Sequence, residues 1–157
     1  RDVERSRGLG DVYKRQLVHI KYLVHLLGDM HCPTHVYYYP DNMTLGKFPI
    51  KLHGVETNYH KIWDGQLLDS RHKFWGFQDY RHALDNYTDE EIARMTEGTP
   101  VEWFEESARR CREIYDWVQP GDELGQEFYN AHAPFAEYQL VLSGYRLAKV
   151  LNALFDR

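Results

Sequence analysis

The chain has 157 residues, of which 43% are apolar and 27% are charged, a balance typical of a globular protein with a buried core. Its net charge of −5 argues against a protein that binds long nucleic acid through a strongly basic surface. No apolar run approaches the length of a membrane-spanning helix, so we expect one domain without a membrane span.

The first sixteen residues differ from the rest of the chain. Residues 1–16 show no apolar periodicity and no signal-peptide core, and they resemble a spurious leader that recurs in translated environmental sequence assemblies. We interpret them as a non-native leader and take residues 17–157 as the protein proper. The alternative is an ordinary solvated, charged tail.

The next segment has the apolar spacing of a helix. Apolar residues recur every three or four positions from Leu17 to Leu27, and Pro33 ends the pattern. Residues 36–55 are rich in Tyr, Pro, Asn and Gly, which predicts a long loop with a short extended piece at 48–52. A second helix is then expected to begin at Thr57 or Asn58.

The second half of the chain also reads as helical. We expect a helix over about 71–86, and a short one capped by Thr88 and Glu91. A longer helix begins at Thr99 and stops before Pro120. Its predicted apolar side carries Phe104, Ala108, Cys111, Tyr115 and Val118. The last helix is expected over about 134–155, which makes the fold class all-α, with loops holding any site.

Two His-x-x-x-Asp pairs are the main functional signal. His25 with Asp29, and His60 with Asp64, each lie four positions apart, so a helix places both side chains of a pair on one face. His35 follows the first pair closely. Imidazole and carboxylate ligands without a thiolate are typical of a catalytic zinc. The alternative is two helix-face hydrogen bonds, although burying such groups without a partner would be costly.

The two cysteines leave a choice open. Cys32 and Cys111 could form one disulfide, or they could be unpaired small hydrophobic residues, which is the interpretation that we favour.

The residues around these pairs resemble a known family. Residues 25–35 read His-x-x-Gly-Asp-x-His-x-Pro-x-His and residues 57–64 read Thr-Asn-x-His-x-x-Trp-Asp, which resembles the S1/P1 class of zinc-dependent nucleases. Residues 143–152 resemble the last helix of that family. The resemblance covers about 17–155 and implies the helical fold shared with zinc phospholipase C, with the N-terminal part missing here.

The resemblance also implies a ligand set and an activity. His25 and Asp29 would bind one zinc, and His35, His60 and Asp64 a second, with Asp29 also facing a third ion as the catalytic carboxylate. The intact family site holds three Zn²⁺ ions; its other ligands precede this segment, so one complete and two partial sites are expected. Zinc would activate the water that hydrolyses single-stranded DNA or RNA to 5′-phosphorylated products, with possible removal of 3′-phosphates from nucleotides.

These implications leave rival functions in place. We expect the parent enzyme to be secreted or periplasmic and this fragment to be impaired, and we infer no protein partner. One rival is a phospholipase C-like phosphodiesterase, and another is a non-catalytic helical module with a vestigial metal site. His31 is expected either to support the ligands or to face solvent, in both cases without binding metal, and Trp63 is expected to belong to the core.

Overall fold

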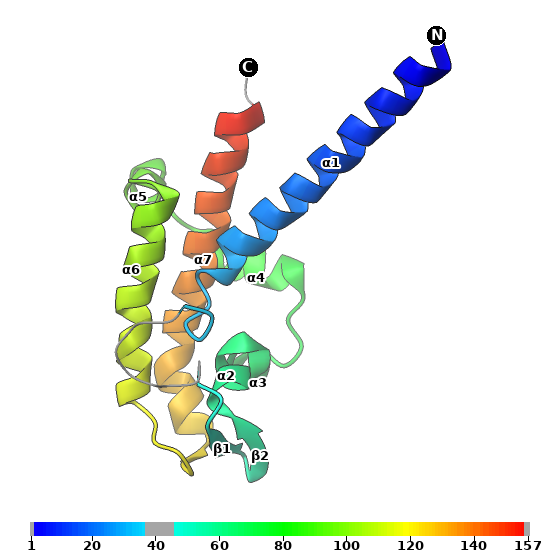
Figure 1. The fold of residues 1–157 in the computed structure, drawn as a ribbon. Helices are drawn as coiled ribbons and strands as arrows, with labels where there is room; N and C mark the ends of the chain where they lie inside the picture. Colours follow the sequence, from blue (N-terminus) through cyan, green and yellow to red (C-terminus); the bar gives the residue numbers. More distant parts are fainter. Residues whose placement is uncertain (1, 37–45, 156–157) are drawn as a thin grey trace.

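The computed structural model describes residues 2–36 and 46–155, with side chains from residue 13 onward. Two long helices dominate it: α1 (Asp2–Asp29) and α7 (Gln126–Phe155). Figure 1 shows α6 and α7 side by side, the small sheet at one end, and the amino-terminal part of α1 projecting away from the other elements. The mainly helical class predicted from the sequence is therefore confirmed.

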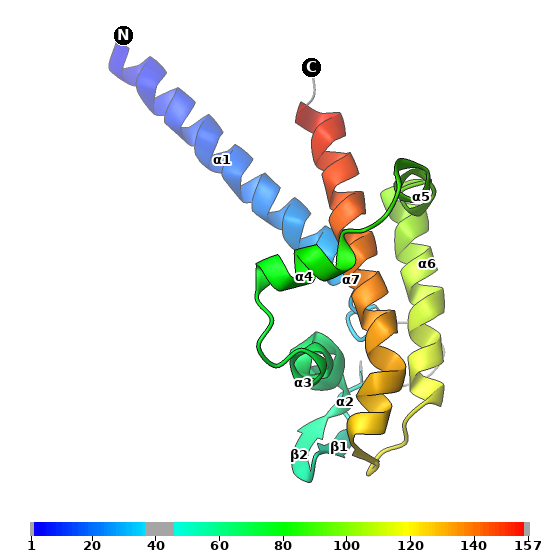
Figure 2. The same cartoon turned by 180° about the vertical axis from the view of Figure 1, so that it is seen from behind.

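Short elements lie between the two long helices. In chain order they are β1 (Pro49–Leu52), β2 (Val55–Asn58), α2 (Tyr59–Lys61), the π-helical turn η1 (Ile62–Gln66), α3 (Leu67–Arg71), α4 (Phe77–Leu84), α5 (Asp89–Met95), α6 (Pro100–Glu113), the 3₁₀ turn η2 (Ile114–Asp116) and β3 (Glu123–Leu124). Figure 2, seen from behind, shows α4 crossing α7. No helix among the described residues combines the length and hydropathy needed to cross a membrane.

The sheet is a feature that the sequence analysis predicted only in part. The extended piece expected at 48–52 is β1, but it pairs with two further strands in the order β2-β1-β3. Strand β2 runs antiparallel to β1 with Ile50 opposite Thr57, and β3 runs parallel to it. The turn between β1 and β2 uses positive φ at His53 (51°) and Gly54 (77°), a conformation that suits a two-residue hairpin. Strands of two to four residues carry too little periodicity to be recognised from sequence.

Two helix boundaries differ from those expected. The helix predicted over 71–86 is shorter, because Gly76 has an extended backbone and its N–H is capped by Oδ2 of Asp79 at 2.8 Å, so α4 begins only at Phe77. The last helix begins at Gln126 and passes through Pro134. A proline inside a helix loses one hydrogen bond, but Ala133 and Ala136 on either side are buried, which favours a continuous helix.

The buried face of α6 is also shifted by one residue. Trp103, Ser107 and Cys111 are buried on this helix, whereas Phe104 is exposed. The predicted and observed stripes share Cys111, so the helical period was right and the side facing the core was misplaced. Burial of Trp103 is favoured by its indole N–H, which donates to the carbonyl of Glu97 at 2.6 Å.

Helix α1 runs without a break through residues 2–16. The interpretation of this stretch as a non-native leader stays a prediction.

The core lies where η1, η2 and the sheet meet α7. Tyr59 is at its centre with 0% exposure, and its hydroxyl donates to the carbonyl of Ile114 at 2.6 Å. Trp63 packs edge-to-face against Tyr59 and Phe135, so it is a core residue as expected. The backbone between Tyr59 and Trp63 carries His60, and this core therefore holds the first turn of the predicted site rigid.

Capping explains why α6 begins at Pro100, and it supplies a prediction. The backbone N–H of Thr99 donates to Oε2 of Glu102 at 2.8 Å, while the Thr99 hydroxyl accepts from the N–H of Glu102. Thr99→Ala is expected to lower the free energy of unfolding by about 1 kcal/mol, measured by urea titration. Arg109→Ala, at an exposed position of the same helix, should change it by less than about 0.5 kcal/mol. Equal effects of the two changes would contradict the assignment of the cap.

Candidate metal centre

A tight turn at the end of α1 carries three side chains that can bind a metal ion, those of Asp29, Cys32 and His35. Asp29 is the last residue of the helix, and its carbonyl accepts a hydrogen bond from the N–H of Cys32 at 3.0 Å. The carbonyl of Cys32 in turn accepts a hydrogen bond from the N–H of His35, also at 3.0 Å. Pro33 lies inside this turn and cannot continue a helix. Successive turns of this kind keep the three side chains close together.

The second segment begins at a capped helix. Oδ1 of Asn58 accepts the N–H of Lys61 at 3.0 Å, which confirms the cap predicted at this position. Helix α2 then widens into η1, which carries Asp64. The backbone of Gly65 leaves the helical conformation (φ 170°, ψ −35°), so the chain is kinked directly after Asp64.

The two segments lie against each other. The hydroxyl of Thr34 donates to the carbonyl of His60 at 3.5 Å, and the thiol of Cys32 lies 3.6 Å from the carbonyl oxygen of Trp63. The His60 N–H donates to the carbonyl of Gly46 at 2.8 Å. The condition on which the sequence-based site depended, that these segments fold side by side, is met.

His35 is the centre of the arrangement. Its Nδ1 lies 2.6 Å from Oδ1 of Asp29, its Nε2 lies 3.4 Å from Oδ1 of Asp64, and its ring stacks on that of His60 with centroids 4.9 Å apart. The three residues predicted to bind one zinc are thus neighbours. The Asp29 side chain is 37% exposed and that of Asp64 is 54% exposed, so both carboxylates are open to solvent.

Asp29 and His25 differ in position from the other predicted ligands. The Asp29 carboxylate touches the ring nitrogen of His35 that faces away from Asp64. A carboxylate on the outer nitrogen of a ligating imidazole fixes its tautomer and orientation. His25 is exposed on α1, one turn before Asp29, and is not part of the closest donor group. The assignment of both residues as ligands stays a prediction.

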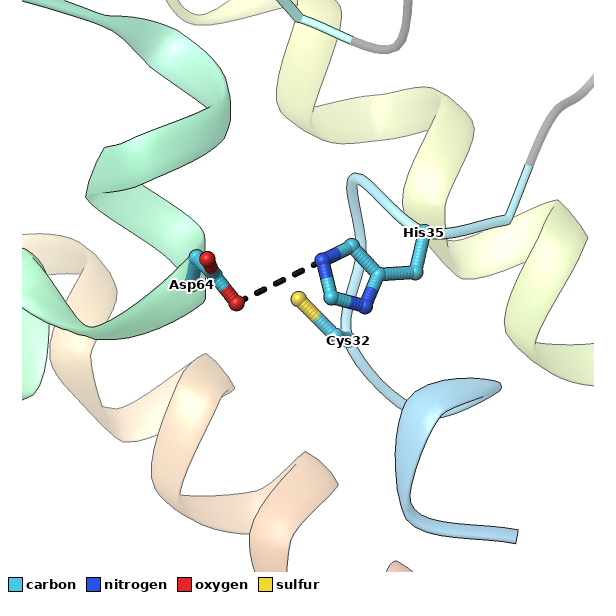
Figure 3. A group of neighbouring side chains, drawn as sticks. All are labelled: Cys32, His35 and Asp64. Carbon is cyan, nitrogen blue, oxygen red and sulfur yellow. Dashed lines mark ion pairs between the residues drawn. The ribbon is translucent and has the colours of Figure 1, made fainter. Parts of the chain in front are cut away.

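The structure brings a thiol into the group that the sequence analysis left out. Among the described residues, Cys32, His35 and Asp64 form one group whose possible ligand atoms all lie within 4.8 Å of one another (Figure 3). Both cysteines are free, which confirms the unpaired interpretation. Burial raises the pKa of the Cys32 thiol. The sequence signal that could have found this thiol is the position of Cys32 between two predicted ligands, Asp29 and His35.

His31 is a structural residue, as expected from its place beside the predicted ligands. It is 2% exposed, its Nδ1 lies 2.7 Å from the carbonyl oxygen of Leu27, and its Nε2 lies 3.1 Å from a guanidinium nitrogen of Arg146. These contacts fit a neutral ring that donates from Nδ1 and accepts at Nε2. Burial and then the charge of Arg146 lower the pKa of His31, against the hydrogen bond to Leu27.

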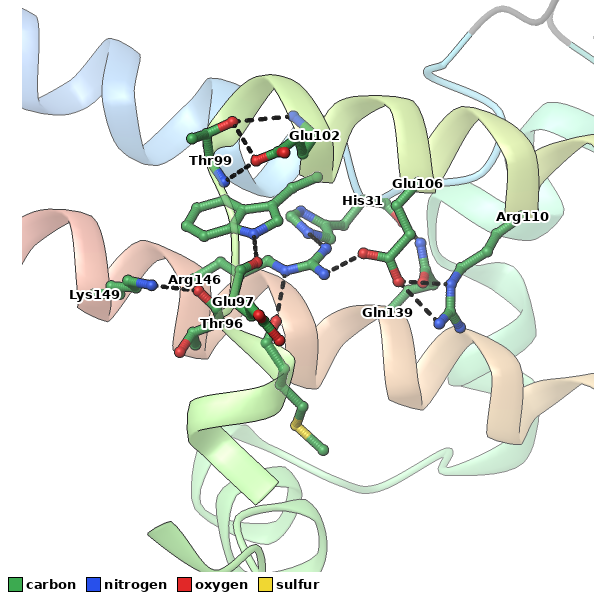
Figure 4. Close-up of polar contacts among 12 residues, drawn as sticks. His31, Thr96, Glu97, Thr99, Glu102, Glu106, Arg110, Gln139, Arg146 and Lys149 are labelled. Carbon is green, nitrogen blue, oxygen red and sulfur yellow. Dashed lines mark hydrogen bonds and ion pairs between the residues drawn. The ribbon is translucent and has the colours of Figure 1, made fainter. Parts of the chain in front are cut away.

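Arg146 joins this turn to three helices. It is 3% exposed, donates from Nε to the carbonyl of Met95 at 2.9 Å, and pairs with the Glu106 carboxylate (Figure 4). The amide of Gln139 donates to the carbonyl of His31 at 3.0 Å. No local sequence pattern indicated this buried network, because its partners come from distant parts of the chain.

The donors present suit a divalent metal. Nitrogen, oxygen and sulfur atoms together match the ligands of zinc, and the group is partly open to solvent because Asp64 is exposed. The group lies at the surface end of a rigid core, which would keep the donors in place when an ion binds.

Comparison with known proteins shows the family of the chain. The model of the family described as S1/P1 Nuclease matches residues 6–156. Endonuclease 2 of Arabidopsis thaliana is 27% identical, with 85% of this chain and 50% of that protein covered. Endonuclease 3 of the same plant is 28% identical, with 87% of this chain and 51% of that protein covered. Nuclease S1 of Aspergillus oryzae is 26% identical, with 86% and 53% covered.

The chain spans about half the length of the curated relatives that it matches. The family match, in contrast, extends over nearly the whole of it. The chain belongs to the S1/P1 nuclease family.

Proposed function

We propose that this chain is part of a zinc-dependent nuclease that hydrolyses phosphodiester bonds of single-stranded DNA or RNA to 5′-phosphorylated products, and that also removes 3′-phosphates from nucleotides. The observation that carries the proposal is the position of His35, between the carboxylates of Asp29 and Asp64 and stacked on His60. Separate segments of the chain supply these groups, and a shared ion explains why they converge.

Each residue has a place in this proposal. His35, His60 and Asp64 would hold one zinc, while His25 and Asp29 would contribute to two further sites whose other ligands lie outside this chain. Asp29 would also orient His35 through Nδ1. Bound zinc would supply an activated water and positive charge for the phosphate oxygens. The open side of Asp64 would face the substrate.

The relatives favour nucleic acid as the substrate. Those described above are named endonuclease or nuclease, which supports a nucleic acid over the choline lipid of a phospholipase C-like enzyme. We also propose that the parent protein acts outside the cytoplasm, secreted or in the periplasm, as the family resemblance implies. Because the chain covers only half of its relatives, we expect it to bind zinc but to turn over substrate poorly when it is alone.

Zinc analysis tests the site directly. After dialysis against zinc and removal of the excess, His60→Ala should contain clearly less zinc per chain than the unchanged protein, because one of three ligands of the most complete site is lost. His82→Ala is the matched control, since His82 is exposed on α4. Equal zinc content in the His60 variant and the unchanged protein would count against the assignment.

Substrate hydrolysis separates the rival functions in the intact parent protein. Cleavage of single-stranded DNA without cleavage of a chromogenic phosphocholine ester supports the nuclease, and the reverse supports the phospholipase-like rival. Tightly held zinc with neither activity in the intact protein would support a non-catalytic helical module.

A further inference from the structure

Cys32 is the donor that neither the sequence pattern nor the proposed function uses. Its side chain is half-buried and forms one group with His35 and Asp64. We propose that the Cys32 thiolate is a ligand of the ion held by His35 and Asp64, which makes this centre a mixed sulfur, nitrogen and oxygen site. This inference rests on the proposed metal site and adds a ligand to it.

The distances allow one ion to reach all three donors. Zinc takes sulfur at about 2.3 Å and imidazole nitrogen at about 2.0–2.1 Å, so around one tetrahedral ion the two atoms lie about 3.6 Å apart. The possible ligand atoms of Cys32, His35 and Asp64 lie within 4.8 Å of one another, so side-chain shifts of about 1 Å or less bring the sulfur to the ion. Nε2 of His35 and Oδ1 of Asp64, at 3.4 Å, already have a separation suitable for two ligands of one tetrahedral ion.

The surroundings of the sulfur favour ligation over simple packing. Sγ of Cys32 lies 3.7 Å from the Thr34 hydroxyl and 3.6 Å from the carbonyl oxygen of Trp63, both of them weak contacts for a thiol. Figure 3 shows the sulfur pointing into the space between Asp64 and the His35 ring. Cys111, in contrast, is fully buried on α6, where it acts as a core side chain.

The backbone keeps the sulfur in this position. The N–H of Cys32 donates to the carbonyl of Asp29, and its carbonyl accepts from the N–H of His35, each at 3.0 Å. The turn is anchored in addition by the bond from Gln139 to the carbonyl of His31. A donor held by its own backbone loses little entropy on binding, which favours ligation by Cys32.

Ligation changes the chemistry expected of this ion. When the metal binds, a sulfur–metal bond forms and the thiol proton passes to solvent. Sulfur also favours zinc and other soft ions over magnesium or manganese. We therefore infer that this ion is retained more firmly than one bound only by nitrogen and oxygen.

Cobalt substitution tests the inference in this chain. Co²⁺ bound to a thiolate shows an intense near-ultraviolet charge-transfer band, in addition to weaker visible bands that also arise with nitrogen and oxygen ligands. We expect the charge-transfer band in the unchanged chain and in Cys111→Ala, and its loss in Cys32→Ser. Zinc affinity measured with a competing chelator should fall by at least about tenfold in Cys32→Ser.

Alkylation provides a check that needs no variant. Iodoacetamide should modify Cys32 in the metal-free chain, and Zn²⁺ should slow this reaction at least tenfold, as read by peptide mass spectrometry. For the cobalt experiment, Cys32→Ser changes only one atom of the side chain. This variant should retain the helical circular dichroism of the unchanged chain, which would show that it folds.

The outcomes distinguish this inference from the proposed function. If Co²⁺ binds with visible bands that His60→Ala removes, but without a charge-transfer band and without protection of Cys32, the metal site stands and the thiolate ligand is excluded. If the chain binds neither Co²⁺ nor Zn²⁺, both the metal site and the thiolate ligand are overturned.

Discussion

Replacing Arg146 with methionine is expected to lower the free energy of unfolding by about 3 kcal/mol, because it leaves buried partners without their hydrogen bonds. The guanidinium is nearly inaccessible and serves Met95, His31 and Glu106 together (Figure 4). Methionine fills most of the volume but cannot donate, so three acceptors lose a donor at once. Part of the loss is offset at Glu106, whose side chain is 30% exposed and can be hydrated.

Urea titration of both proteins measures the loss. Arg109→Met is the matched control, because Arg109 is exposed and meets Glu105 only at 3.9 Å. A change of less than about 0.5 kcal/mol is expected there. If Arg146→Met were as stable as the control, the network would not contribute to folding as the structure indicates.

The pH dependence of the stability difference between the unchanged protein and Arg146→Met gives an independent check. Burial opposes ionisation of Glu106, but the hydrogen bond and charge of Arg146 outweigh it and hold the pKa below its ordinary value of 4.5. A carboxyl whose pKa is lowered on folding binds fewer protons in the folded state, so its stabilising contribution is present above pH 4.5 and is lost as the pH falls below it. The advantage of the unchanged protein over Arg146→Met should therefore shrink on acidification through that range.

Asp29→Asn is expected to weaken zinc binding by about 10- to 100-fold, the range typical of removing a carboxylate that orients a ligating histidine. The carboxylate lies 2.6 Å from Nδ1 of His35 and would favour the tautomer that is protonated on Nδ1. That tautomer leaves Nε2, which faces Asp64, free to bind the ion. Asparagine keeps the shape but loses the charge, and its amide can also turn its N–H₂ toward the ring. In the proposed three-zinc site, Asp29 is a ligand as well, so the same change should also lower the number of ions bound by the intact parent protein.

The affinity for zinc and the number of ions bound separate the two roles of Asp29, which are to orient His35 and to bind metal itself. Chelator competition on this chain reports the orientation of His35, and metal analysis of the intact protein reports ligation. Asp89→Asn, an exposed position at the start of α5, makes the same chemical change as a control. An affinity within about twofold of the unchanged chain would mean that the Asp29–His35 contact does not tune the ion.

Local chemistry made part of the fold predictable. Helices α5 and α6 begin where Thr88 and Thr99 predict, because each cap is formed by residues within four positions of one another. The site segments were recognisable for a similar reason, since four-residue spacing places His60 and Asp64 on one helical face. In each case the interacting groups are neighbours in sequence, so the pattern contains the interaction.

Features that depend on distant partners could not be read in this way. The buried side of α6 was misplaced by one residue, because Trp103 and Phe104 are both apolar and only packing against Arg146 and α7 selects between them. The start of α7 was placed at Pro134, since the burial that favours a continuous helix there comes from other elements. Strand β3 was missed for the same reason, because it pairs with β1 from more than seventy positions away.

The sequence by itself determined the helical class and the family resemblance, because both follow from spacing and short-range motifs. The five nitrogen and oxygen ligands that the resemblance implies stay a prediction. Tertiary structure alone decided that His35 lies between two carboxylates, that Arg146 braces the turn beneath it, and that the sulfur of Cys32 enters the donor group. The physical reason is that a side-chain atom binds a metal ion only if it points toward the ion and lies at bonding distance from it. Both are set by the packing of the turn after α1 against α2 and η1, which the core around Tyr59 holds in place.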